Sequence, residues 1–287
     1  MTTGYLARLA ARSAATGTVL CLGIDPDPER LPAGFARDLA GVERFATGLL
    51  DAAGPYAAAV KPNLAFFEAF GSAGMAVLER LRDRLPGDLP LVADAKRGDI
   101  GTTAARQAVA LFDVLGADAV TVSPYLGEAA IAPLLERPDR FAYVLCRTSN
   151  DGAAELQDLV VAADENGAPA ERLHERVARR AATWGPGGTV GLVVGATAPD
   201  ELATIRAIAP GLAFLVPGVG AQGGAVEPVL RHGPATDAPA GGVPGGGLLI
   251  NVSRGIADAL PDDTGQDPFE AIAARAAEWA RRLPVLP

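Results

Sequence analysis

The chain contains few of the side chains that most often bind metals or act as nucleophile and base. Its 287 residues include two cysteines and two histidines. Two cysteines exclude a disulfide scaffold, and so few Cys and His side chains argue against a zinc cluster and a Ser–His–Asp triad. We predict no metal site, buried strand thiols at Cys21 and Cys146, and solvated surface residues at His174 and His232. Chemistry would then depend on Asp, Lys and backbone groups.

Aromatic residues, positive charge and long apolar runs are also scarce. Aromatics make up 5% of the chain, and 25 Lys and Arg stand against 34 Asp and Glu, a net charge of −9. Neither value suits a nucleic-acid surface, which needs a basic face. The longest uncharged stretch, residues 207–226, contains two prolines and five glycines, which a membrane helix does not tolerate. We expect a cytoplasmic protein with no nucleic-acid or membrane partner.

Eight short apolar runs alternate with helical patterns along the chain. Their apolarity is continuous, which is typical of parallel strands buried on both faces. Eight strand–helix units in a chain of this length predict a single (β/α)8 TIM barrel over residues 1–287, with a doubly wound sheet as the alternative. The predicted strands are residues 18–24, 57–61, 89–93, 119–123, 141–146, 189–195, 212–217 and 248–252.

Two segments interrupt this alternation and are predicted to be insertions. Residues 148–167 follow the fifth predicted strand. Residues 233–247 precede the eighth strand and contain six glycines and three prolines. That composition indicates a flexible surface connection.

Two helix starts can be predicted in more detail. The helical pattern of residues 172–184 puts Leu173, Val177, Ala181 and Trp184 on one apolar face. Thr197, with Asp200 three residues further on, predicts a capping box at the start of the next helix.

Polar and charged residues directly follow many of the predicted strands. In a barrel the carboxyl ends of the strands form one rim, and the active sites of such barrels are located there. Charges unrelated to a site would instead be scattered over the helices. We therefore predict a site at this rim. It would include Asp25, Lys61, Asp94, Lys96, Asp99, Ser123, Gln222 and Arg254.

The third predicted strand and its following loop carry the most distinctive charge pattern. Asp94 and Lys96 are two residues apart, so in a strand they point to the same side. Asp99 follows in the loop, and Lys61 approaches from the second strand, which predicts an alternating Lys–Asp–Lys–Asp array. Opposite charges keep a lysine protonated although burial acts the other way. A charged lysine fixed in place is a proton donor, and the carboxylates would repel an anionic substrate group.

Residues 218–223 match the pattern G-x-G-x-x-G after the seventh predicted strand. A dinucleotide site is disfavoured because no acidic residue ends a following strand at the required distance. Loops after the seventh and eighth strands of such barrels commonly bind phosphate. We therefore predict a phosphate site that includes Pro217, Gly220, Gln222 and Arg254, with a purely structural turn as the remaining alternative.

Taken together, these motifs resemble the orotidine 5′-phosphate decarboxylase family. Its D-x-K-x-x-D-I-x-x-T signature is matched in register by Asp94, Lys96, Asp99, Ile100 and Thr103. Residues 148–150, Thr-Ser-Asn, resemble the longer bacterial subgroup. The resemblance spans residues 18–256, and further matching stretches are residues 23–25, 60–63, 123–125, 217–224 and 251–256.

The resemblance implies a TIM barrel that decarboxylates orotidine 5′-phosphate to uridine 5′-phosphate (UMP) in pyrimidine biosynthesis without a cofactor. Lys96 would protonate C6 of the pyrimidine as carbon dioxide leaves. Asp94 and Asp99 would flank the departing carboxylate, and Lys61 would complete the charge network and touch the ribose.

The resemblance also implies how the rest of the nucleotide is held. Asp25 would accept hydrogen bonds from the ribose hydroxyls, and Ser123 would read the pyrimidine edge. Gln222 would bridge phosphate and base, while Arg254 would bind the phosphate.

Members of this family share active sites between two subunits. The residues that match Asp99, Ile100 and Thr103 enter the site of the other subunit, so we expect a homodimer.

Two other functions remain open on the sequence. A metal-dependent sugar-phosphate decarboxylase of the same barrel superfamily can share the Asp-x-Lys-x-x-Asp pattern, although Lys61, Ser123 and Gln222 disfavour it. A barrel that only binds a phosphorylated ligand is also conceivable, because fold alone does not fix function. Such a protein would have no reason to place four alternating charges at one rim.

Overall fold

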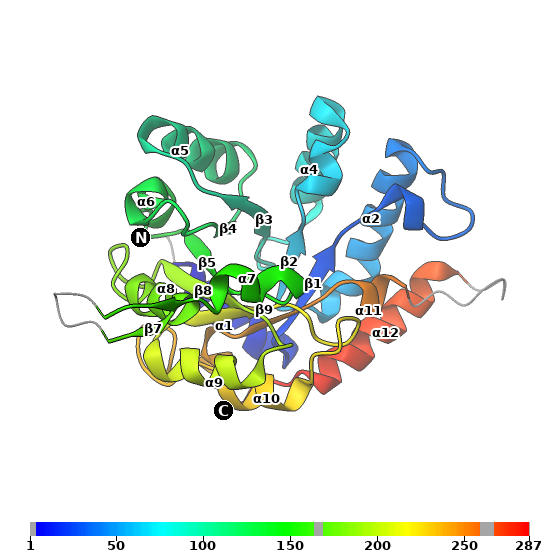
Figure 1. Cartoon of the computed structure of the whole chain (residues 1–287). Helices are drawn as coiled ribbons and strands as arrows, with labels where there is room; N and C mark the ends of the chain where they lie inside the picture. The colour runs from blue at the N-terminus through cyan, green and yellow to red at the C-terminus, as the bar shows by residue number, and fades with distance from the viewer. Residues whose placement is uncertain (1–3, 164–168, 259–266, 287) are drawn as a thin grey trace.

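All eight predicted strands are present, and they lie side by side in one parallel sheet (Figure 1). The computed structural model describes residues 4–163, 169–258 and 267–286. Along the sheet the order is β2-β1-β10-β9-β8-β5-β4-β3. The bounds are β1 Leu20–Ile24, β2 Ala59–Pro62, β3 Val92–Arg97, β4 Ala119–Val122, β5 Phe141–Arg147, β8 Val190–Val194, β9 Ala213–Val216 and β10 Leu249–Val252.

The two ends of this sheet meet and nearly close it into a barrel. Isolated parallel bridges join Val60 of β2 to Leu91, and Asn63 to Asp94 of β3. The main chain also bonds across this seam, because the Val60 N–H donates to the Pro90 carbonyl at 2.9 Å. The TIM-barrel prediction is therefore confirmed, and the doubly wound alternative is wrong.

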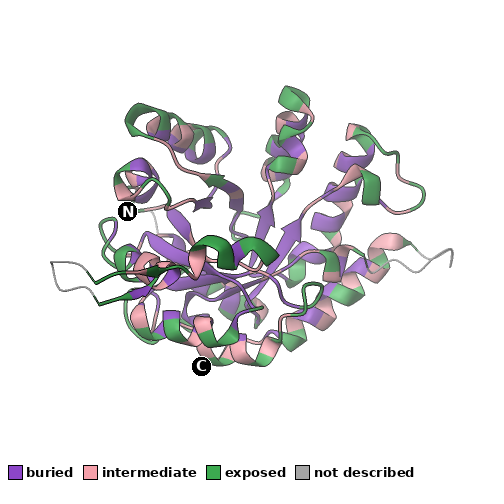
Figure 2. Ribbon diagram, viewed as in Figure 1, coloured by how far each residue is buried: buried purple, intermediate pink, exposed green. Residues whose placement is uncertain are grey.

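Helices cover the outside of the sheet, as Figure 1 shows. The strands are buried on both faces (Figure 2), which explains their continuous apolarity in the sequence. Among the described residues, no helix combines the length and the apolar character needed to span a bilayer. The helices are α1 Tyr5–Thr16, α2 Leu39–Ala53, α3 Ala65–Glu68, α4 Gly71–Arg84, α5 Gly101–Ala108, α6 Ala132–Leu135, α7 Ala154–Gln157, α8 Leu173–Ala181, α9 Pro199–Ile208, α10 Val226–His232, α11 Arg254–Ala257 and α12 Pro268–Arg282.

Helix α1 closes the amino-terminal end of the barrel. Its Tyr5 and Leu9 side chains are buried in the same cluster as the inward-facing residues of the strands. The Tyr5 hydroxyl lies 3.1 Å from the hydroxyl of Tyr143 on β5. Arg8 forms a 2.6 Å ion pair with Asp118, directly before β4. With this end closed, the barrel interior opens only toward the carboxyl ends of the strands.

Both cysteines are buried free thiols, as predicted. Cys21 faces the barrel interior with the α1 cluster, and burial raises the pKa of its thiol to about 12. Cys146, near the end of β5, lies 3.2 Å from the carbonyl oxygen of His174.

His174 is not a solvated surface residue, so that prediction is wrong. Helix α8 buries His174, Ala178 and Ala181. Of the predicted apolar face, Ala181 and Trp184 are buried, whereas Leu173 and Val177 are only half-buried. The imidazole is fully buried because its Nδ1 atom donates to the Gln157 carbonyl oxygen at 2.9 Å. His232, at the end of α10, is half-buried.

The predicted capping box before α9 is also absent. Helix α9 begins at Pro199, its N-cap residue is Ala198, and no side chain caps it. Proline at the first helical position removes one of the N–H groups that a cap would satisfy.

The first predicted insertion, residues 148–167, forms structure of its own. It contains α7 and the short strand β6 (Val160–Val161), which pairs antiparallel with β7 (Glu171–Arg172). Residues 164–167 of this insertion lie outside the described residues.

The second predicted insertion, residues 233–247, is only partly a surface connection: residues 236–239 and 242–244 are exposed, but the rest packs against the protein. Ala235 and Ala240 are buried, as are the three glycines 245–247. A Cβ on Gly247 would lie 2.7 Å from the Cβ of Ala213, so glycine permits this close packing against β9. The glycine-rich composition therefore reflects tight contact with the barrel.

Candidate active site

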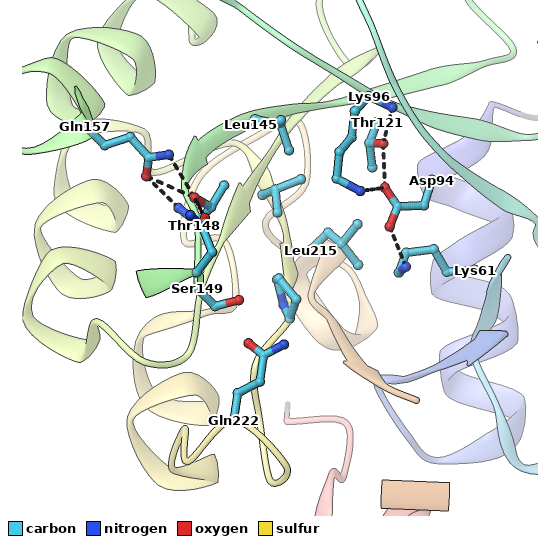
Figure 3. A pocket seen from close by; sticks show the side chains of 13 residues that line it. Lys61, Asp94, Lys96, Thr121, Leu145, Thr148, Ser149, Gln157, Leu215 and Gln222 are labelled. Carbon is cyan, nitrogen blue, oxygen red and sulfur yellow. Dashed lines mark hydrogen bonds and ion pairs between the residues drawn. The ribbon is translucent and has the colours of Figure 1, made fainter. Parts of the chain in front are cut away.

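A cavity of about 460 Å³ opens at the carboxyl ends of the strands (Figure 3). Side chains that point into a barrel alternate along each strand, so the residue two places after an interior core residue also faces inward. Ala59, Val92 and Ala119 belong to the interior core. The next inward positions toward the rim are Lys61, Asp94 and Thr121, and all three line the cavity. The other lining residues are Lys96, Leu145, Thr148, Ser149, Asn150, Gln157, Val193, Leu215, Pro217 and Gln222.

Three members of the predicted charge array are in direct contact. Lys61 Nζ lies 2.8 Å from Asp94 Oδ2, and Lys96 Nζ lies 2.6 Å from Asp94 Oδ1. The side chains of Lys61 and Asp94 are 6% and 10% exposed, whereas that of Lys96 is 49% exposed. Asp94 therefore holds a buried cation on one oxygen and an accessible cation on the other.

Burial and charge act against each other in this array. Burial favours the neutral acid at Asp94, but the Lys61 and Lys96 ammonium groups outweigh it and hold the pKa of Asp94 well below its usual range. Burial acts to lower the pKa of Lys61, but Asp94 and then Asp25 outweigh it, so the pKa of Lys61 is raised. Asp94 and Lys61 are thus both charged at neutral pH.

The backbone at Lys96 is unusual. Lys96 has φ +48°, and it is the only non-glycine residue with positive φ in the part of the chain that the structure describes. The register between β3 and β4 also shifts between Ala93 and Arg97. Such backbone conformations cost energy in L-residues and cluster at functional sites.

Thr121 was missed by the sequence reasoning and lies at the centre of this arrangement. Its hydroxyl donates to Asp94 Oδ1 at 2.9 Å and accepts the Lys96 backbone N–H at 3.0 Å. A threonine within an apolar run reads as an ordinary β-branched strand residue. Its position two residues after Ala119, which faces the barrel interior, was the sequence feature that could have placed Thr121 in the cavity.

Asp99 does not join the other three charges within this chain. It does not line the cavity, and its carboxylate accepts the N–H of Ile100 at 2.7 Å. Ile100 is 71% exposed, and neither it nor Thr103 lines the cavity. The single chain therefore builds a Lys–Asp–Lys array, and the predicted fourth member faces away from it.

Ser123, predicted at the pyrimidine edge, does not line the cavity either. Strand β4 ends at Val122, and Ser123 lies beyond it, where its N–H donates to the Arg97 carbonyl at 2.8 Å. The serine that lines the cavity is Ser149, after β5, which Figure 3 shows near Gln222.

The first insertion supplies the wall that carries Ser149. The side-chain oxygen of Gln157 accepts the Thr148 N–H at 2.8 Å, and its amide nitrogen donates to the Thr148 hydroxyl at 2.8 Å. The Gln157 carbonyl in turn accepts from the buried His174. These contacts fasten the turn after β5 to α7 and α8.

A second cavity of about 290 Å³ adjoins the first and shares Gln222 with it. Asp25 and Arg254 line this second cavity. Asp25 Oδ1 and Asn251 Oδ1 are buried and have no hydrogen-bond partner within the described ranges. Arg254 has no carboxylate within ion-pair distance among the residues whose structure is described. Among the described residues, Asp25 and Arg254 therefore give the second cavity an unpaired acceptor and an unpaired cation for a ligand.

The glycine loop between β9 and α10 bonds mainly to itself. The N–H groups of Gly220, Gly223 and Gly224 donate to carbonyl oxygens within the loop, at 3.2, 2.8 and 3.0 Å. Gly220 lines neither cavity, whereas Pro217 lines the first. Of the predicted phosphate site, Gln222 and Arg254 line the second cavity. The N–H groups of the three glycines already donate to carbonyl oxygens of the loop.

These features define a (β/α)8 barrel whose carboxyl rim carries a buried Lys–Asp–Lys array and a neighbouring unpaired arginine, a combination suited to a small anionic ligand. The sequence model described as the orotidine 5′-phosphate decarboxylase / HUMPS family matches residues 18–265. The chain belongs to this family.

Individual relatives agree over nearly the whole chain. The orotidine 5′-phosphate decarboxylase of Roseiflexus castenholzii is 46% identical, over 91% of this chain and 90% of the relative. That of Halorubrum lacusprofundi is 44% identical, over 97% and 96% of the two chains. Among solved structures, Leishmania donovani OMP decarboxylase is 38% identical with a TM-score of 0.79, and the match covers 97% of this chain and 98% of that one.

Proposed function

We propose that this protein decarboxylates orotidine 5′-phosphate to UMP in de novo pyrimidine biosynthesis, without a cofactor. The observation that carries the proposal is the Lys61–Asp94–Lys96 array, with contacts of 2.8 and 2.6 Å, on the wall of a rim cavity. Both the family and the named relatives support the same reaction.

Lys96 is the proton donor in this proposal. When the bond between C6 and the carboxylate breaks, its electron pair stays on C6 and carbon dioxide leaves. The ring offers this pair no adjacent carbonyl, so a fixed cation beside C6 is the available stabilisation. The Lys96 ammonium then transfers a proton to C6 and, being half exposed, recovers one from solvent.

Asp94 holds this donor in place, and Lys61 in turn holds Asp94. Asp94 bonds both ammonium groups through different oxygens. A negative charge near the substrate carboxylate also favours its departure. A divalent metal at Asp94 would have to displace these ammonium groups, which disfavours the metal-dependent sugar-phosphate decarboxylase.

The two adjoining cavities accommodate the two halves of a nucleotide. The pyrimidine would lie in the larger cavity, with Ser149 at its edge in place of Ser123. The ribose hydroxyls would bond Asp25, whose Oδ1 atom is buried without a partner among the described residues. Gln222 lies between the cavities, and Arg254 would bind the phosphate.

We further propose that residues 1–287 form one domain and that two copies form a homodimer in the cytoplasm. Ile100, Tyr125 and Leu126 are 71%, 81% and 52% exposed, an apolar surface at the rim that a second copy would cover. In such a dimer Asp99, with Ile100 and Thr103, would complete the charge array of the other subunit.

The function is tested by incubating the purified protein with orotidine 5′-phosphate and measuring carbon dioxide and UMP. We expect one UMP for each carbon dioxide, with an unchanged rate after exhaustive treatment with a chelator. Absence of turnover would overturn the proposed substrate. Turnover that the chelator abolishes and a divalent metal restores would overturn the cofactor-free mechanism.

A further inference from the structure

Strand β4 places one hydroxyl among otherwise apolar residues at the floor of the cavity. Thr121 is 2% exposed and lies between Val120 and Val122, which pack into the outer core. Figure 3 shows its side chain between Lys96 and Asp94. A valine would fill the same volume in this strand, so packing alone does not explain the hydroxyl.

The hydrogen-bond directions around this hydroxyl are fixed by chemistry. The Lys96 N–H can only donate, so at 3.0 Å it occupies an acceptor position of Thr121 Oγ1. The carboxylate of Asp94 can only accept, so the single hydroxyl proton points to Asp94 Oδ1, 2.9 Å away. The same Oδ1 atom accepts from Lys96 Nζ at 2.6 Å. A closed ring therefore runs from the Lys96 backbone through Thr121 and Asp94 to the Lys96 side chain.

This ring supplies a hydrogen-bond acceptor for the backbone N–H of Lys96. The register shift in β3 lies between Ala93 and Arg97, so the Lys96 N–H has no regular partner in the sheet. Thr121 provides that partner and holds Lys96 at φ +48°. A non-glycine residue with positive φ is energetically unfavourable, so contacts with the surrounding structure must hold it in that conformation.

We propose that Thr121 is a positioning residue, which fixes the Lys96 ammonium against Asp94 and toward the reacting carbon. This inference rests on the proposed decarboxylation. Thr121 itself exchanges no proton with substrate. Its effect is to keep the proton donor within the narrow range of positions in which transfer occurs.

The test compares three variants with the wild type in steady-state turnover of orotidine 5′-phosphate and in UMP binding. Thr121→Val removes the hydroxyl but keeps the shape, and Thr121→Ser keeps the hydroxyl but loses a methyl group. Thr189→Val is the matched control, because Thr189 is also 2% exposed and its hydroxyl has no partner in the described chain. Circular dichroism and thermal unfolding establish that each variant is folded.

We expect Thr121→Val to lower kcat roughly 10- to 100-fold while KM and UMP affinity change less than about twofold, because the loss affects the transition state and not ground-state binding. Thr121→Ser should recover most of kcat, and Thr189→Val should match the wild type. A purely packing role predicts the reverse order, with Thr121→Ser the more damaged variant.

The outcomes separate this inference from the function on which it rests. No turnover by the wild type would overturn the proposed decarboxylation. Wild-type turnover together with an unchanged kcat in folded Thr121→Val would overturn the positioning role alone. If Thr121→Val does not fold, Thr121→Ser decides, because a kcat reduced more than about tenfold in this folded variant would show that the hydroxyl does not position Lys96.

Discussion

Two buried cations at different places in the barrel are stabilised in opposite ways. Lys61, at the carboxyl rim, bonds the carboxylate of Asp94, and its pKa is raised. Arg206, on α9, has no ion pair within the described part of the chain, and burial lowers its pKa to about 9. Its guanidinium lies 3.6 Å from the ring centroid of Phe214.

The partners of Arg206 show what this second cation does. It donates to main-chain carbonyl oxygens at the end of α9 and in the glycine-rich segment that follows α10, which therefore need no other donors. An opposite charge fixes a cation at one point, as proton transfer requires, whereas neutral carbonyls let one cation join several chain segments. In the proposed mechanism the rim charge serves chemistry, whereas the Arg206 charge serves folding. The acceptors are the carbonyls of Ala209, Pro210, Leu212, His232 and Gly233.

The largest combined loss of stability and turnover should follow from neutralising the rim anion. Asp94→Asn keeps the shape but removes the carboxylate that pairs with buried Lys61, which costs about 3–5 kcal/mol. It also releases Lys96, so kcat/KM should fall by a factor on the order of 1,000 or more. Steady-state kinetics and urea unfolding measure both effects. Asp51→Asn, in an exposed pair with Arg84, is the control and should change neither.

Removing the second cation should affect stability and leave chemistry intact. Arg206→Met strands several buried carbonyl groups and should destabilise the protein by roughly 2–4 kcal/mol. The kcat of the folded fraction should equal that of the wild type. Urea unfolding and active-site titration measure the two quantities. If the kcat of Arg206→Met fell as far as that of Asp94→Asn, the proposed separation between a catalytic role for the rim charges and a folding role for Arg206 would be contradicted.

A smaller effect is expected where the first insertion meets the cavity. Gln157→Leu removes the bonds to Thr148 that hold the turn carrying Ser149. Loss of about 1.4 kcal/mol in substrate binding would raise KM roughly tenfold. Gln107→Leu, on α5 outside the cavity, is the control. Equal KM values for the two variants would mean that the insertion does not shape the pyrimidine site.

The smallest effect concerns pH. Because the pKa of Asp94 is lowered on folding, this carboxylate contributes stability above its unfolded pKa, about 3.9, and that contribution is lost as pH falls further. The raised pKa of Lys61 contributes stability below about pH 10.4, which is lost as pH rises beyond the folded value.

The difference in unfolding free energy between wild type and Asp94→Asn should therefore stay constant between about pH 5 and pH 9 and shrink below about pH 4. Urea unfolding across this range measures it. A change centred near pH 6.5 would instead indicate a histidine.

Much of the fold and part of the site could be predicted because they depend on simple periodicity. Continuous apolar runs identified the eight strands. The two-residue alternation along a strand put Asp94 and Lys96 on one side, and the neighbouring strand was expected to bring Lys61 to Asp94, as the cavity shows. In a parallel barrel the carboxyl ends of all strands lie at one rim, so these positions come together there irrespective of the helix sequences.

The parts that failed depend on irregular backbone and tertiary contacts. The register shift in β3 and the positive φ of Lys96 accompany the bond from the Lys96 N–H to Thr121, which strand periodicity does not predict. His174 was misjudged because its neighbours in sequence are polar, although a carbonyl from α7 bonds it in the interior. The glycine-rich segment is packed because Arg206, far away in sequence, binds its first carbonyl.

The most direct test of the central claim is the rate of carbon dioxide release from orotidine 5′-phosphate by Lys96→Ala. Lys96 is half exposed, so its loss should leave the fold and UMP binding intact. We predict that kcat falls by a factor on the order of 10,000 or more, because both the cation beside C6 and the proton donor are lost. Release at the wild-type rate by the folded variant would contradict the account.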